Sequence, residues 1–147
     1  MNRPETAVAC FKQGYSCSQA IFATYCGALD RDKALKIASG FGGGMARLGL
    51  TCGAVTGAVM AIGLKHGGAT GAEAAKQKTY ELVREFKQRF EARNGSLICK
   101  DLLGCDIGTP EGMAEAREKQ LFQQRCARFV RDTVELVENG VARQPTR

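Results

Sequence analysis

The sequence predicts an all-α fold, a compact single-domain bundle of about six to seven helices around a central helix rich in glycine and alanine. No segment shows the two-residue alternation of apolar and polar side chains that marks a strand, whereas helix start and stop signals recur along the chain. The longest apolar run, residues 51–64, is too short to cross a bilayer and is typical of a buried core helix. A length of 147 residues is enough for one domain with a real hydrophobic core.

The first third of the chain predicts three helices. The first covers residues 4–14, where a proline suits the first turn. Ser16 and Gln19 have the spacing of a capping box and start the second helix. Asp30 is a suitable N-cap for the third. The glycine-rich stretch 40–45 cannot form a stable helix interior, so we expect a flexible turn there.

The rest of the chain predicts a central helix followed by longer amphipathic ones. Residues 51–66 are apolar on almost every side, which indicates a buried helix. A capping box at Thr70 predicts the start of a long amphipathic helix over residues 70–93. A short helix over residues 97–103 and one or two helices over residues 109–139 complete the bundle.

Composition narrows the class of protein. We expect one cysteine-rich domain over residues 1–141, a disordered tail over residues 142–147, no signal peptide and a cytoplasmic location. The net charge is +6, but basic and acidic residues alternate along the helices, as Glu85 and Arg89 do, which is typical of a solvated helix face. We therefore predict neither a nucleic-acid partner nor a membrane partner.

The seven cysteines are the unusual feature of the composition. Structural disulfides are rare in a reducing cytoplasm, so abundant cysteine indicates metal binding, catalysis or core packing. No two cysteines are separated by only two residues, which excludes the thioredoxin dithiol, the common zinc-ribbon spacing and the bacterial ferredoxin run. Any site must therefore be assembled from distant segments.

Three cysteines fall in the first turn of predicted helices, namely Cys17, Cys52 and Cys99. Unpaired N–H groups and the helix dipole favour an anion at this position, so we expect a lowered thiol pKa at all three. The alternative is that a small side chain simply fits a crowded helix start.

The other cysteines carry weaker signals. Cys126 lies on the apolar face of the last predicted helix, and Cys105 is a candidate extra or alternative ligand. We expect Cys10 and Cys26 to be core residues. The single histidine, His66, ends the central helix too far from the cysteines at its start for a shared site.

Several segments together match a known pattern. Residues 14–20 read Gly-Tyr-Ser-Cys-Ser-Gln-Ala, residues 40–45 read Gly-Phe-Gly-Gly-Gly-Met, and residues 52–57 read Cys-Gly-Ala-Val-Thr-Gly, with Cys99 and Cys126 following. In this combination the chain resembles the C-GCAxxG-C-C family of redox-active proteins over roughly residues 10–137.

The resemblance implies a shared site at four positions. The four cysteines of the family name fall on Cys17, Cys52, Cys99 and Cys126. One departure is Gly53, which stands directly after Cys52 where the family name has alanine. The family's redox role is itself inferred from its cysteines, so the resemblance names no substrate.

Two classes of function follow. In the first, one shared site is formed by Cys17, Cys52, Cys99 and Cys126, with Cys105 in reserve. These cysteines either bind zinc or an iron–sulfur cluster or act without metal as redox thiols. The site would serve electron transfer to an unknown partner protein or redox sensing. Candidate cofactor contacts are the glycines that allow close backbone approach: Gly43, Gly44, Gly53 and Gly57. In the second, the protein is a non-enzymatic module with core cysteines that binds a small molecule or another protein, with a homodimer left open.

Overall fold

The structure is a computed structural model, and it describes residues 1–140. Residue 141, where the predicted domain ends, and the predicted tail 142–147 lie outside the described residues. The all-α prediction is confirmed, since residues 1–140 form eight α-helices and their only β pairing is one isolated bridge. The helices are α1 (Arg3–Lys12), α2 (Cys17–Thr24), α3 (Arg31–Ala38), α4 (Gly53–His66), α5 (Glu73–Asn94), α6 (Cys99–Leu103), α7 (Pro110–Glu118) and α8 (Ala127–Asn139).

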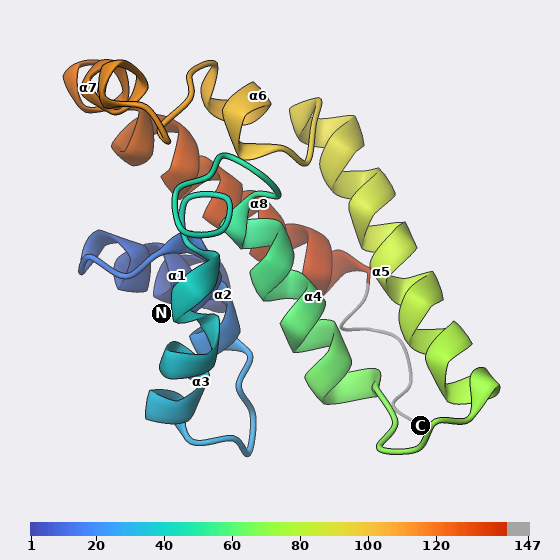
Figure 1. Cartoon of the computed structure of the whole chain (residues 1–147). Helices are drawn as coiled ribbons and strands as arrows, with labels where there is room; N and C mark the ends of the chain where they lie inside the picture. The colour runs from blue at the N-terminus through green and yellow to red at the C-terminus, as the bar shows by residue number, and fades with distance from the viewer. Residues whose placement is uncertain (141–147) are drawn as a thin grey trace.

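Helix α4 lies at the centre of the bundle, as its apolar composition predicts (Figure 1). It packs closely on α2 because two glycines face that helix. A Cβ on Gly57 would lie 2.9 Å from the Cβ of Ile21, and a Cβ on Gly53 would lie 3.1 Å from the backbone nitrogen of Ser18. The small-residue stripe therefore accommodates the backbone of α2.

The main core forms where α1, α2, α4, α5 and α8 meet. Burying large apolar side chains contributes about 1.5–3 kcal/mol for each one. The largest fully buried apolar side chains are Phe86 and Phe90 of α5, Ile21 of α2, Ile62 of α4, and Val130 and Val134 of α8. Helix α8 crosses the molecule diagonally and ties α1 to α5 (Figure 1).

Three helix starts lie two or three residues after the predicted ones. Helix α6 begins at Cys99 and not at residue 97, and Ile98 is its N-cap. Helix α4 begins at Gly53, so Cys52 is its N-cap and not its first-turn residue. Helix α5 begins at Glu73 with Ala72 as N-cap and has no side-chain cap, so the predicted capping box at Thr70 is wrong. Thr70 lies two residues before the N-cap, in a loop that follows two consecutive glycines, and its hydroxyl does not cap the helix.

The C-terminal helical segment is divided into two helices. Gln120 adopts φ +54°, which ends α7, and residues Phe122–Cys126 then form a π-helical turn that runs directly into α8. Within residues 1–140, no helix combines the length with the hydrophobicity that a membrane span requires.

Candidate functional site

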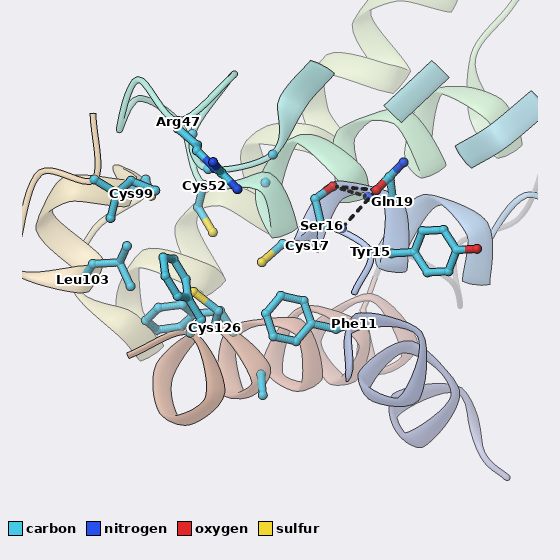
Figure 2. A pocket seen from close by; sticks show the side chains of 18 of the residues that line it. Phe11, Tyr15, Ser16, Cys17, Gln19, Arg47, Cys52, Cys99, Leu103 and Cys126 are labelled. Carbon is cyan, nitrogen blue, oxygen red and sulfur yellow. Dashed lines mark hydrogen bonds between the residues drawn. The ribbon is translucent and has the colours of Figure 1, made fainter. Parts of the chain in front are cut away.

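A cavity of about 740 Å³ opens between the loop after α1, the starts of α2, α4 and α6, and the segment from α7 to α8. Its lining includes four cysteines, namely Cys17, Cys52, Cys99 and Cys126. Figure 2 shows the sulfur atoms of Cys17, Cys52 and Cys126 pointing toward one space, with Cys99 at its edge. Four thiols from separate segments thus share one site.

Cys17 is the first residue of α2, and a capping box fixes its position. The backbone N–H of Gln19 donates to Ser16 Oγ at 3.3 Å, and the backbone N–H of Ser16 donates to Gln19 Oε1 at 3.0 Å, as the sequence predicts. The buried hydroxyl of Ser18 donates to the carbonyl of Ala38 at 2.9 Å. These bonds hold the start of α2 against the end of α3, so the backbone that carries Cys17 has one defined place.

A short antiparallel bridge brings Cys52 and Cys99 together. The backbone N–H of Cys52 donates to the carbonyl of Leu97 at 2.8 Å, and the N–H of Cys99 donates to the carbonyl of Leu50 at 2.6 Å. Thr51 and Ile98 form the bridge between them. Both cysteines stand at helix starts that this pairing places side by side.

The π-helical turn Phe122–Cys126 ends at Cys126, which lines the cavity from the side of α8 (Figure 2). Such turns are rare and occur frequently at functional sites. Within the turn, Arg125 reaches α6 and donates to the carbonyl of Leu103 at 2.7 Å. This bond connects the segment of Cys126 to the helix that begins with Cys99.

The glycine-rich stretch forms one left-handed turn beside the cavity, visible as a ring next to α6 in Figure 1. Five consecutive residues have positive φ: Gly43 (+66°), Gly44 (+71°), Met45 (+67°), Ala46 (+49°) and Arg47 (+63°). A non-glycine residue in this region costs about 1–2 kcal/mol, and a run of three is unusual. The N–H groups of residues 45–47 donate to the carbonyls of residues 40–42 at 3.0–3.1 Å, so the surrounding hydrogen bonds hold the turn.

The pKa values differ from the expectation for helix starts. Burial raises the pKa of Cys52 to about 11, although the N–H groups of Ala54 and Val55 lower it in part. Burial and the neighbouring thiol of Cys52 raise the pKa of Cys99 to about 12. The predicted lowering at Cys17, Cys52 and Cys99 is therefore wrong, because burial and neighbouring thiols outweigh the favourable helix ends.

Cys17 and Cys126 form a coupled pair. Interaction between the two side chains raises the pKa of Cys17 and lowers that of Cys126, so the pair loses its first proton more readily than its second. Burial also raises the pKa of Cys17, whose sulfur faces inward although the residue is partly exposed. Cys126 is the only one of the four whose pKa falls below the ordinary thiol value.

The other predicted site residues fall into three groups. Gly43, Gly44 and Gly53 line the cavity, whereas Gly57 packs on α2 outside it. Cys105 lies close enough to Cys99 to influence its pKa but is outside the cavity lining. As expected for core residues, Cys10 is buried and Cys26 packs against a small apolar cluster.

The predicted metal ligands, Cys105 included, do not form a ready-made metal site. Within residues 1–140, no group of three or more histidine, cysteine, aspartate or glutamate side chains is arranged to hold a metal ion. Zinc and an iron–sulfur cluster at these cysteines therefore stay predictions.

Three cationic residues of the cavity had no signal in the sequence. Lys12, Arg47 and Arg117 are exposed side chains from α1, the left-handed turn and α7, and all three line the cavity. The alternation of basic and acidic residues along the sequence indicates only that such side chains lie on a solvated helix face. Their common location depends on the tertiary fold, so no local pattern could have identified them.

Comparison with known proteins decides the family. The model of the family described as "Putative redox-active protein (C_GCAxxG_C_C)" matches residues 15–139. The chain belongs to this family. The matched range contains all four cavity cysteines of this C_GCAxxG_C_C protein, and its redox-active description agrees with the clustered thiols. No curated protein and no solved structure matches the chain.

Proposed function

We propose that this protein performs thiol–disulfide exchange, with Cys126 as the attacking thiol and Cys17 as the resolving thiol. The observation that carries the proposal is that both thiols line one cavity and lie close enough to interact, which lowers the pKa of Cys126. A thiolate is the nucleophile in exchange, and its population at neutral pH rises as the pKa falls toward the ambient pH. Cys126 is therefore the first thiol of the cluster to become reactive.

In the first step the Cys126 thiolate attacks one sulfur of a disulfide substrate RSSR. The S–S bond of the substrate breaks, one RS⁻ group leaves and takes up a proton from solvent, and a mixed disulfide Cys126–S–S–R forms. Because both thiols line the cavity, the substrate sulfur can approach Cys126 without opening the core.

In the second step Cys17 resolves the mixed disulfide. Its pKa is raised in part by the negative charge of Cys126, and that charge disappears when Cys126 is covalently bound. The Cys17 thiolate then attacks the sulfur of Cys126, releases the second RSH and forms a Cys17–Cys126 disulfide. In total, two protein thiols and RSSR become one protein disulfide and two RSH molecules.

Cys52 and Cys99 have a different role in this scheme. With pKa values of about 11 and about 12, they stay protonated at neutral pH. Neutral thiols next to the reacting pair add no negative charge, so a second anion does not oppose formation of the Cys126 thiolate.

The test follows free thiols in fully reduced protein incubated without oxygen with hydroxyethyl disulfide, an uncharged substrate. We expect the wild type to lose two thiols and retain no adduct mass. Cys17→Ser should accumulate one mixed disulfide on Cys126, and Cys126→Ser should react far more slowly. Cys105→Ser is the matched control, because Cys105 lies near the cluster but outside the cavity lining.

Two results would overturn the proposal. One is a Cys126→Ser variant that reacts at the wild-type rate while its circular dichroism spectrum remains helical. The other is loss of thiols that maps to Cys10 and Cys26. Either result, in a protein that still binds small molecules as the wild type does, would favour the alternative function, a binding module whose cysteines are core residues.

A further inference from the structure

The lining of the cysteine cavity carries positive charge only. Three of its side chains are cationic, those of Lys12, Arg47 and Arg117, and none of its residues is an aspartate or glutamate. The chain as a whole contains 21 basic and 15 acidic residues, so acidic side chains are common elsewhere. Their exclusion from this lining favours an anionic occupant.

The three cations are not committed to other groups. Among residues 1–140, the ion pairs involve other basic residues, such as Arg89 and Lys119, each of which pairs with a glutamate four residues earlier in the chain. The side chains of Lys12, Arg47 and Arg117 have no ion-pair or hydrogen-bond partner in that part of the chain. They are therefore available to a ligand.

Arg47 has the most constrained position of the three. It is the last residue of the left-handed turn, at φ +63°, and its backbone N–H donates to the carbonyl of Gly42 at 3.0 Å. A Cβ on Gly43 would lie 2.8 Å from both Cα and Cγ of Arg47, so a glycine is needed for this close packing. Figure 2 shows the Arg47 side chain extending over the cavity near Cys52.

The guanidinium groups are not needed to explain the thiol chemistry. The pKa values of the four thiols are shifted by burial, by one another, by backbone N–H groups at Cys52, and by Cys105 and Asp106 at Cys99. A cation that activated a thiolate would lower its pKa directly. The remaining role for the cations is contact with the molecule that enters the cavity.

Building on the proposed exchange reaction, we infer that the substrate is a small-molecule disulfide bearing carboxylate groups, and that Arg47 is its main specificity-determining contact. The cavity volume of about 740 Å³ lies within the range of small-molecule sites. In this arrangement the carboxylates lie against Arg47, Lys12 and Arg117, while the central S–S bond reaches Cys126. Guanidinium and carboxylate groups match in planar geometry, which favours arginine for this contact.

The experiment compares three disulfides of similar length: dithiodipropionate, which is anionic, hydroxyethyl disulfide, which is neutral, and cystamine, which is cationic. Each second-order rate constant is divided by that for mercaptoethanol with the same disulfide, which removes differences in intrinsic reactivity. We expect the order anionic, neutral, cationic, from fastest to slowest. Added salt should slow the anionic reaction and leave the neutral one unchanged, because screening weakens exposed charge pairs.

Arg47→Gln should slow the reaction with dithiodipropionate about fivefold, which corresponds to the loss of a contact of about 1 kcal/mol. The rate with hydroxyethyl disulfide should not change. Arg47→Lys should recover part of the rate because it restores the charge. Arg84→Gln is the matched control, since Arg84 is an exposed arginine of α5 outside the cavity lining. It should change none of the three rates.

The outcomes separate this inference from the exchange reaction on which it rests. Reaction with hydroxyethyl disulfide but no preference for the anion, and no salt effect, would overturn the anionic substrate alone. Failure of wild-type protein to react with any disulfide would overturn both. If Arg47→Gln does not fold, the salt dependence of the wild type still decides the question.

Discussion

The thiols of Cys17 and Cys126 lie close enough to shift each other's pKa, which links the first residue of α2 to the residue that precedes α8. Their interaction favours the thiolate form of Cys126 and disfavours that of Cys17. Two chemically identical side chains thereby acquire different reactivity from their relative placement alone.

The first prediction concerns the pH dependence of alkylation at Cys126. Iodoacetamide should modify this residue at lower pH than Cys52 or Cys99, whose pKa values are about 11 and about 12. Cys17→Ala removes the side chain that interacts with Cys126, so the alkylation profile should shift to higher pH. Cys17→Ser keeps an O–H donor and should shift it less. Peptide mass spectrometry after timed labelling measures the profile of each variant. Identical profiles in Cys17→Ala and Cys17→Ser would contradict the pairing of Cys17 with Cys126.

The second prediction concerns stability in alkaline solution. The folded-state pKa values of Cys52 and Cys99 lie above the ordinary thiol value of 9.0, so the unfolded chain releases their protons first. Their contribution is complete below pH 9.0 and is lost as pH rises toward about 12. Denaturant unfolding in this window, with a phosphine reductant present, should show a falling free energy of unfolding.

A variant separates this effect from other titrations. Burial and Glu138 raise the pKa of Tyr25, which gives a loss of the same sign at high pH. Cys99→Ala should make the free energy of unfolding fall less steeply with pH, while the part of the fall that is due to Tyr25 remains. An unchanged slope would show that Cys99 does not titrate abnormally.

The third prediction concerns the left-handed turn. A Cβ on Gly44 would lie 2.6 Å from the nitrogen of Leu50 and 2.8 Å from the Cβ of Cys99, at φ +71°. Gly44→Ala should therefore reduce the free energy of unfolding by about 2 kcal/mol or more. Gly40→Ala is the control, since a Cβ there meets nothing within 4 Å and its φ is not positive. Chemical denaturation of both variants checks the difference, and equal stabilities would contradict the turn's geometry.

The fourth prediction concerns Arg125, which donates to the carbonyls of Leu102 at 3.4 Å and Leu103 at 2.7 Å. Arg125→Met leaves the end of α6 without this donor and should cost about 1–2 kcal/mol of stability. Gln124→Met alters an exposed neighbour in the same π-helical turn and should be close to neutral. Equal effects of the two substitutions would show that the bond to α6 is not needed.

The parts of the fold with local chemical causes could be predicted from the sequence. The capping box of Ser16 and Gln19 fixes a helix start through two hydrogen bonds within four residues. The apolar composition of α4 and its glycines predicted a central helix with a close neighbour. The family resemblance named the four cysteines that line the cavity.

The features that depend on tertiary contacts could not be predicted. The bridge between Thr51 and Ile98, which brings Cys52 and Cys99 together, involves one residue pair and leaves no alternating pattern. The left-handed turn includes Met45, Ala46 and Arg47, residues with no local preference for it. Thiol pKa values follow burial, which helix position alone does not reveal.

The most direct test of the proposed redox pair is disulfide mapping. Wild-type protein is equilibrated without oxygen in a graded dithiothreitol redox buffer, quenched with acid, alkylated and digested for mass spectrometry. The account predicts one intramolecular disulfide, between Cys17 and Cys126, appearing over a single two-electron transition, with Cys10, Cys26 and Cys105 alkylated throughout. A dominant disulfide between any other pair, or seven free thiols at every potential of the series, would contradict it.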